Sequence, residues 1–198
     1  MPSRITPPSA ERLAAHADVW TAYEQVMGFV PETSLTMARV PGLLDAYVGL
    51  AMTVVGNGLI SQELAQLVAH ITSNASGCRY CQAHTVAHAE KLGVAPDKLA
   101  DLWSFDTSDR FDDAERAALR LAFHAGQQPN AVDDADIEAC RAHFDDDQIT
   151  NIIAVCALFG FLNRWNDSLA STLEPGPLAA AERYLGARGW DAGKHASP

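Results

Sequence analysis

The stretch Ser73-Asn74-Ala75-Ser76-Gly77-Cys78-Arg79-Tyr80-Cys81-Gln82-Ala83-His84 joins a polar turn to the start of a long periodic run. Two cysteines stand three positions apart in it, and no Gly or Pro interrupts the chain from Cys78 to Leu92. Gly93 follows directly, which is typical of a helix C-terminus. The pattern therefore predicts a helix whose first turn carries both cysteines.

This position favours redox chemistry at the two thiols. The first turn of a helix stabilises an anion, because its backbone N–H groups lack partners and the helix dipole is positive there. A helix N-terminus and a second nearby thiol can lower a thiol pKa from about 8.5 to about 7 or below, which raises the thiolate fraction up to roughly thirtyfold. We therefore expect Cys78 and Cys81 to form a redox pair.

Helical periodicity continues on both sides of the cysteines. Ser61 is placed to cap a helix over about 62–73, whose apolar residues recur every three to four positions. No window alternates apolar and polar residues for long enough to predict a strand. The sequence predicts an all-α multi-helix bundle in one domain over residues 1–198, with further helices at 9–27, 33–39, 41–57, 96–105, 112–125, 133–143, 148–170 and after Pro175-Gly176-Pro177.

Composition and charge narrow the possible partners. The 198 residues are 48% hydrophobic and 20% charged, enough to bury a full core, and the net charge of −11 argues against nucleic acid or an anionic membrane as partner. The apolar run Ile152–Leu162 is too short to span a bilayer and indicates a buried central helix. The N-terminus lacks the apolar core of a signal peptide. We expect a soluble, cytoplasmic protein.

Zinc binding is the main alternative for the cysteine pair. With His84 and His88 the cysteines form the pattern C-x2-C-x2-H-x3-H. All four side chains would lie on one short stretch of helix, however, and could not converge on a tetrahedral centre. Cys140 and Cys156 fall in apolar helical patterns and are expected to be small buried residues. We therefore expect neither a metal nor a cofactor.

Polar side chains on two helices could serve the thiols. His84 lies one helical turn after Cys81 on the same face, where an imidazole can take a thiol proton or hold a thiolate as an ion pair. On the preceding helix Glu63, Gln66 and His70 form one stripe. The short turn at 74–77 would bring this stripe near the thiols. For Glu63 the solvated side of an amphipathic helix is an equally good interpretation.

Other candidates carry weaker signals. Tyr80, His70 and His88 are candidate pocket residues, with a solvated surface position preferred for His88. The segment Asn163–Asp167 is unusually polar for the end of a buried helix. It could line a pocket, but an Arg164–Asp167 pair that fastens helices together is the preferred interpretation. There is no glycine-rich phosphate loop and no nucleophile elbow.

Six segments resemble one known family. They are Gly28-Phe29-Val30-Pro31, Pro41-Gly42-Leu43-Leu44-Asp45-Ala46-Tyr47, Leu59-Ile60-Ser61, the block from Leu67 to Gly93, Asp113-Ala114-Glu115-Arg116-Ala117-Ala118-Leu119 and Phe161-Leu162-Asn163-Arg164. Together they span about residues 28–168 and resemble the carboxymuconolactone decarboxylase superfamily, in its AhpD-like (alkyl hydroperoxidase D-like) redox branch. The resemblance implies an all-α fold, homo-oligomers and thiol-dependent peroxidase or disulfide reductase activity.

The resemblance also implies roles for individual residues. In the redox branch the second cysteine attacks the peroxide and the first resolves the sulfenic acid as a disulfide, roles that fall on Cys81 and Cys78. We expect Cys81 to have the lower pKa of the two. A glutamate twelve residues before the first cysteine and a histidine after the second relay the proton. Here Gln66 stands at the glutamate position, and His84 comes third after Cys81, with Thr85 at the fourth position.

Two hypotheses follow. The first is a thiol-dependent peroxidase or disulfide oxidoreductase that takes a hydroperoxide substrate and a dithiol electron donor, with Glu63 replacing the carboxylate missing at Gln66. The second is a non-peroxidatic decarboxylase-like enzyme, or a redox-sensing or small-molecule-binding oligomer. The decarboxylase branch does not use a CxxC pair, which argues against lactone decarboxylation. In both cases we expect a homo-oligomer that buries much of the helix at 148–165 or at 41–55.

Overall fold

The computed structural model describes residues 3–197, which form eleven α-helices and no strand, so the all-α prediction is confirmed. The α-helices are α1 (Ala10–Ala14), α2 (Ala17–Met27), α3 (Glu32–Met37), α4 (Leu43–Val55), α5 (Gln62–Ala75), α6 (Arg79–Lys91), α7 (Pro96–Ala100), α8 (Asp113–Gly126), α9 (Asp134–Arg141), α10 (Asp146–Leu169) and α11 (Pro175–Leu185). Short 3-10 helices follow as η1 (Leu102–Ser104), η2 (Gly186–Arg188) and η3 (Gly193–His195).

Side-chain caps begin four of the eleven α-helices in residues 3–197, namely α5, α8, α9 and α10. The hydroxyl of Ser61 accepts a hydrogen bond from the Leu64 backbone N–H at the start of α5, as the sequence predicts. Reciprocal capping boxes begin α8, α9 and α10, at Asp112, Asp133 and Asp145. Each satisfies backbone N–H groups that the first helical turn leaves unpaired.

The helix expected over 9–27 is instead two helices, α1 and α2. The chain leaves helical geometry at His16, whose φ is −117° and ψ 29°. The indole N–H of Trp20 donates to the Leu13 carbonyl at 2.6 Å, and that carbonyl would otherwise bond within a continuous helix. The indole therefore satisfies the end of α1 and fixes the bend.

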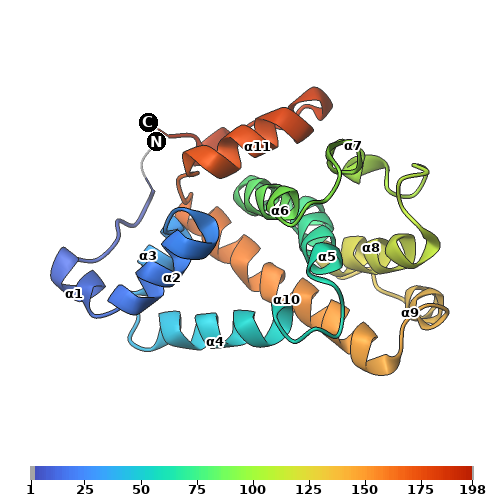
Figure 1. Ribbon diagram of the computed structural model, residues 1–198, viewed down its shortest axis with the longest axis horizontal. Helices are drawn as coiled ribbons and strands as arrows, with labels where there is room; N and C mark the ends of the chain where they lie inside the picture. Colours follow the sequence, from blue (N-terminus) through green and yellow to red (C-terminus); the bar gives the residue numbers. More distant parts are fainter. Residues whose placement is uncertain (1–2, 198) are drawn as a thin grey trace.

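Helices α5, α6 and α10 form the centre of the molecule (Figure 1). Helix α5 packs against α6, α8 and α10, and α11 covers α6. The reversal between α5 and α6 passes through Gly77 at φ +75°, a conformation that costs glycine little. Helix α8 approaches α5 closely at Gly126, where an added Cβ would lie 2.6 Å from the Thr72 carbonyl oxygen. The central position expected for the apolar helix α10 is confirmed.

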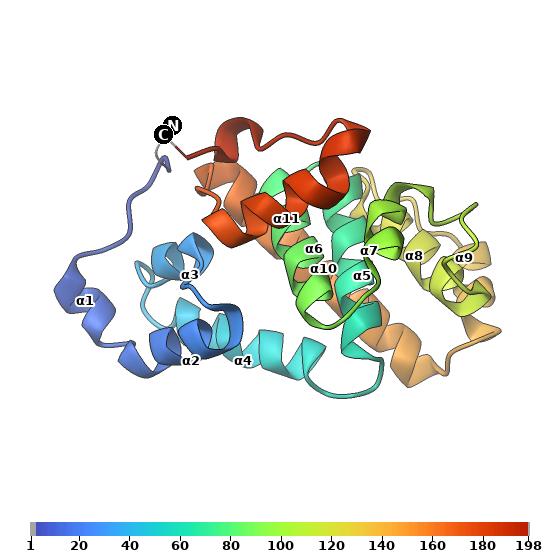
Figure 2. The ribbon, with the colours of Figure 1, turned by 45° about the horizontal axis from the view of Figure 1, so that its top comes forward.

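The N-terminal helices α1 to α4 lie to one side of this centre in both views (Figures 1 and 2). They reach it through α3 and α4, which contact α10. Met37 and Leu44 are fully buried at these contacts. Cys140 and Cys156 are both buried, as expected. No helix among residues 3–197 is long and apolar enough to cross a bilayer.

Candidate active site around the two cysteines

The two cysteines occupy the first turn of α6, as the sequence predicts, and both thiols are free. Cys78 is the N-cap residue and Cys81 lies one turn further on; both are buried. The Cys78 side chain lies close enough to Cys81 to raise the pKa of its thiol. Cys81 lines a pocket, and Cys78 does not. The Cys81 sulfur is therefore open to a bound molecule, whereas the Cys78 sulfur lies outside the pocket.

This pocket has a volume of about 510 Å³ and lies between α2, α4, α6 and α10. Its walls are largely apolar, with Val19, Val48, Ala51 and Val55 from the N-terminal helices facing Leu158 and Phe159 of α10. On the α6 wall the polar side chains His84, Thr85 and His88 accompany Cys81. A pocket of this size and character takes an organic molecule with a reactive group presented to the sulfur.

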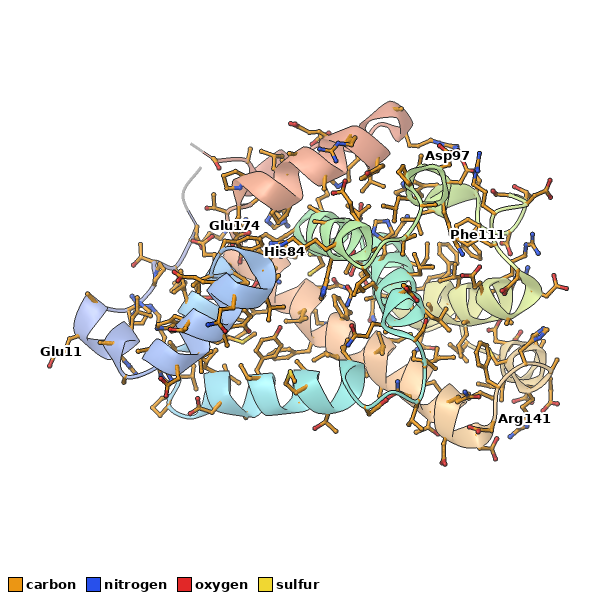
Figure 3. The ribbon with its side chains drawn as sticks, viewed as in Figure 1. Glu11, His84, Asp97, Phe111, Arg141 and Glu174 are labelled. Atoms are coloured by element: carbon orange, nitrogen blue, oxygen red, sulfur yellow. The ribbon has the colours of Figure 1, made fainter. Side chains whose placement is uncertain are left out.

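His84 makes a contact that the sequence does not reveal. Its Nε2 lies 2.7 Å from Oε2 of Glu174, the residue immediately before α11. The ring stacks on Tyr80 with centroids 4.3 Å apart, and the Tyr80 hydroxyl donates to Glu174 at 3.0 Å. Figure 3 shows the two labelled side chains side by side where α11 meets α6. The contact fixes the orientation of the imidazole in the pocket wall.

The Glu174 carboxyl is held ionised. Burial raises its pKa, but the hydrogen bond and charge of His84, together with the Glu32 backbone N–H at 2.8 Å, outweigh burial and leave the pKa below its usual value. A carboxylate only accepts hydrogen bonds, so Nε2 of His84 carries the proton. In the neutral ring Nδ1 is then the nitrogen that can accept a further proton.

The expected low pKa of Cys81 is corrected by the structure. Burial raises the pKa of the Cys81 thiol well above its usual value, and the neighbouring Cys78 adds to the effect. The helix terminus is present, but desolvation of a fully buried thiolate outweighs it. Cys81 therefore rests as a thiol and needs a base when it reacts.

Asn166 of α10 supplies a donor to this sulfur. Its amide Nδ2 donates to Cys81 Sγ at 3.5 Å and lowers the thiol pKa, against the stronger effect of burial. The orientation of the Asn166 amide is fixed, because its Oδ1 accepts hydrogen bonds from the Thr33 hydroxyl at 2.6 Å and the Ser171 hydroxyl at 2.9 Å. Asn166 thus holds an N–H group at the place where negative charge develops when Cys81 ionises.

The Arg164–Asp167 pair preferred from the sequence does not form. Arg164 is exposed and donates to the Gly160 carbonyl. Asp167 instead contacts Lys194 at 2.8 Å and His195 at 3.3 Å, both near the C-terminus. The polar end of α10 serves the cysteine site and the C-terminal segment.

The three polar residues of the α5 stripe, Glu63, Gln66 and His70, do not share one environment. Glu63 is exposed and lies outside the pocket, so its expected role as replacement carboxylate is wrong. Gln66 is buried and lines the pocket. His70 is buried behind it, with Nδ1 3.0 Å from the Thr85 hydroxyl, and burial lowers its pKa to about 4. Helix α5 turns its first residues toward solvent, which separates Glu63 from the other two.

Two of the three candidate pocket residues line the pocket. Tyr80 and His88 both line the pocket, so the preferred surface position for His88 is wrong; His70 does not line it. Burial lowers the pKa of His88. Among residues 3–197, the one group of three metal-ligating atoms within 4.8 Å of one another joins Cys78 to Asp167 and His195. It includes neither histidine of the C-x2-C-x2-H-x3-H pattern.

Sequence reasoning missed Glu174 and Asn166. Glu174 precedes Pro175-Gly176-Pro177, a sequence typical of a helix start, but 90 residues separate it from His84. Asn166 was noted as part of a polar segment, with no indication that it faces Cys81. No local pattern in the chain relates these residues to α6.

The fold and site define an all-α protein with a buried dithiol at the edge of an apolar pocket. The model of the carboxymuconolactone decarboxylase family matches residues 41–123. The solved structure of the debrominase Bmp8 is 32% identical, with 91% of this chain and 97% of that chain covered and a TM-score of 0.83. The chain belongs to the carboxymuconolactone decarboxylase family.

Further similar proteins extend this picture. A cysteine-to-alanine variant of Bmp8, in complex with 2,3,4-tribromopyrrole, has a TM-score of 0.84 and 32% identity. An uncharacterized peroxidase-related protein from Ralstonia eutropha JMP134, described as an alkylhydroperoxidase AhpD core, covers 88% of this chain and 94% of its own, with a TM-score of 0.78 and 24% identity, and so shares the fold. The uncharacterized protein YnjA of Escherichia coli K12 is 32% identical over 111 residues, 56% of this chain and 57% of YnjA.

Proposed function

We propose that the protein is a thiol-dependent oxidoreductase. Cys81 attacks an electrophilic substrate in the pocket, and Cys78 resolves the oxidised product as a disulfide. The observation that carries this proposal is the arrangement of the pair: Cys81 lines the pocket, and Cys78, at the N-cap of the same helix, does not. A dithiol electron donor then reduces the disulfide and resets the site.

A hydroperoxide is the first candidate substrate. The Cys81 thiolate attacks the terminal peroxide oxygen, an S–O bond forms as the O–O bond breaks, and the alcohol leaves after taking a proton. Cys78 then attacks the Cys81 sulfenic acid, which yields the disulfide and water. The apolar walls favour an organic hydroperoxide over hydrogen peroxide, because only an organic group gains from their burial.

His84 and Glu174 supply the proton transfers in this scheme. Nδ1 of His84 takes the Cys81 proton and returns it to the leaving oxygen, while the Glu174 carboxylate at Nε2 stabilises the imidazolium in between. The Asn166 amide stabilises the thiolate at the moment of attack. Glu174 thus occupies, from another helix, the role of the carboxylate absent at Gln66.

A brominated aromatic ring is the second candidate substrate, favoured by the 32% identity to a debrominase over 97% of its chain. In this version the Cys81 thiolate takes the bromine, and the ring carbon accepts a proton as the C–Br bond breaks. Cys78 then displaces bromide from sulfur and forms the same disulfide. The pocket, the two thiols and the dithiol donor serve both reactions.

Counting thiols tests the proposal. One equivalent of cumene hydroperoxide should remove two free thiols per wild-type chain, and a dithiol should restore them. Cys81→Ser should lose none at Cys78, whereas Cys78→Ser should stop at a Cys81 sulfenic acid that a sulfenate-specific reagent captures. A tribromopyrrole in place of the peroxide distinguishes the two substrates. Unchanged thiols with both would refute the thiol-dependent oxidoreductase and would favour a non-peroxidatic enzyme or a small-molecule-binding protein.

A further inference from the structure

Cys78 has polar neighbours of its own, distinct from those of Cys81. Its Sγ, a ring nitrogen of His195 and a carboxylate oxygen of Asp167 all lie within 4.8 Å of one another. His195 comes from η3 near the C-terminus and Asp167 from the end of α10. Neither residue lines the pocket, so this cluster lies on the far side of the cysteine pair from the substrate.

The orientation of His195 is fixed. Its ring is buried, and Nδ1 lies 2.7 Å from the Ser171 backbone carbonyl, which can only accept a hydrogen bond. Nδ1 therefore carries a proton. The Leu173 backbone N–H also donates to the His195 carbonyl at 2.9 Å, which anchors the segment that carries the ring.

Nε2 of His195 is consequently left to accept a proton. It lies 3.3 Å from Oδ1 of Asp167. In the neutral ring two acceptors face each other across this distance, whereas a proton on Nε2 turns the contact into a charge-assisted hydrogen bond. An imidazolium here is bonded at both nitrogens, to Ser171 and to Asp167.

The surrounding charges are compatible with a neutral resting ring. The charged or titratable groups that face His195 are Cys78 and Tyr80 of α6, Asp167 of α10 and Lys194. Burial lowers the pKa of His195, the bonds to Ser171 and Asp167 raise it, and the net direction is down. The His195 ring is therefore neutral at neutral pH, with Nε2 free to accept a proton.

We propose that His195 is the base that accepts the Cys78 thiol proton when Cys78 attacks oxidised Cys81, with Asp167 as its positioning residue. The inference rests on the proposed function. The Cys78 S–H bond and the Cys81 S–O bond break as the S–S bond forms. The Cys78 proton moves to Nε2, the leaving hydroxide takes a proton from solvent to become water, and His195 then returns its proton to solvent. Each sulfur then has its own histidine and carboxylate, His84 with Glu174 at the pocket and His195 with Asp167 behind it.

The attack of Cys78 on oxidised Cys81 can be measured separately with an aromatic disulfide reagent, which releases a coloured thiol each time a cysteine attacks it or displaces it. With one equivalent of reagent, Cys81 releases the first coloured thiol and becomes a mixed disulfide, and Cys78 releases the second as the internal disulfide forms. His195→Gln should leave the first release unchanged and slow the second at least about tenfold at neutral pH. Asp167→Asn should slow the second release by a smaller factor.

The pH dependence separates a base from a structural residue. Without His195, the rate of the second release should rise about tenfold per pH unit around neutrality, whereas the wild-type rate should be nearly flat there. His124→Gln is the matched control, since His124 also pairs with a carboxylate, Asp136 at 2.7 Å, at the contact of α8 and α9. It should leave both releases unchanged.

Two results would overturn the proposal. The first is an unchanged second release in both His195→Gln and Asp167→Asn. The second is that the purified wild-type protein retains one zinc ion per chain and the His195→Gln variant does not. This result would make Cys78, Asp167 and His195 metal ligands. Because the reagent is not a peroxide, the assay decides the role of His195 even if no hydroperoxide oxidises the pair.

Discussion

The Glu174 carboxylate lies 2.7 Å from His84 Nε2, although 90 residues separate the two in the chain. The contact joins the start of α11 to the middle of α6, where α11 covers the cysteine helix. In the proposed function it supplies the ionised carboxylate that the chain lacks at Gln66.

Glu174→Gln should lower the rate of Cys81 oxidation by roughly one to two orders of magnitude, because the amide cannot stabilise the His84 imidazolium. Single-turnover kinetics with an organic hydroperoxide measure the rate. Glu63→Gln, at an exposed position, is the control and should change it less than about twofold. The reverse pattern, a silent Glu174→Gln and a slow Glu63→Gln, would place the relay on α5 instead.

The buried His70 should make the protein less stable as the pH falls. Its pKa is about 4 in the folded state, against an ordinary value of 6.5. Above pH 6.5 the ring is neutral in both states; below it, only the unfolded chain takes up the proton, until the folded ring also protonates near pH 4. The loss reaches at most about 3 kcal/mol.

Urea unfolding at several pH values in this window measures the effect. His70→Gln should be less stable at neutral pH, since it changes the contact with Thr85, but should lose less stability on acidification than the wild type. His88 and His195 contribute to the acid sensitivity of both proteins, so the difference between the two curves reports His70. Parallel curves would contradict the prediction.

Gly126→Ala should destabilise the fold by about 1–3 kcal/mol, because the added methyl group would lie 2.6 Å from the Thr72 carbonyl oxygen and push α8 away from α5. Gly160→Ala in α10 is the matched control. Its Cβ would meet only the Arg164 side chain, at 3.6 Å, so the gain in helix propensity should stabilise the protein by about 0.5–1 kcal/mol. Thermal or urea unfolding distinguishes the two, and equal stabilities would rule out the close approach.

The protein should be a homo-oligomer, because apolar side chains remain exposed on the helices expected to associate. Leu50 of α4 is 51% exposed and Ile153 of α10 is 43% exposed. Light scattering at micromolar concentration should show more than one chain. Leu50→Glu or Ile153→Glu should dissociate the assembly, and Phe123→Glu on α8 serves as the control. A monomeric wild type would refute the prediction.

The sequence by itself determined the helices and the position of the two thiols. Caps such as Ser61 and Asp112 act within one turn of the residues they bond, so their signals lie inside a short window of sequence. The same holds for the spacing that places Cys78 and Cys81 in the first turn of α6 and turns His84 to the face of Cys81.

Only the tertiary structure decided what surrounds the thiols. Asn166 and His195 reach the cysteines, and Glu174 reaches His84, from other segments of the chain, so these contacts depend on packing between residues far apart in the sequence. The pKa of Cys81 shows the physical reason. The helix terminus that favours its thiolate is encoded locally, whereas the burial that raises its pKa is imposed by neighbouring elements, and desolvation outweighs the dipole.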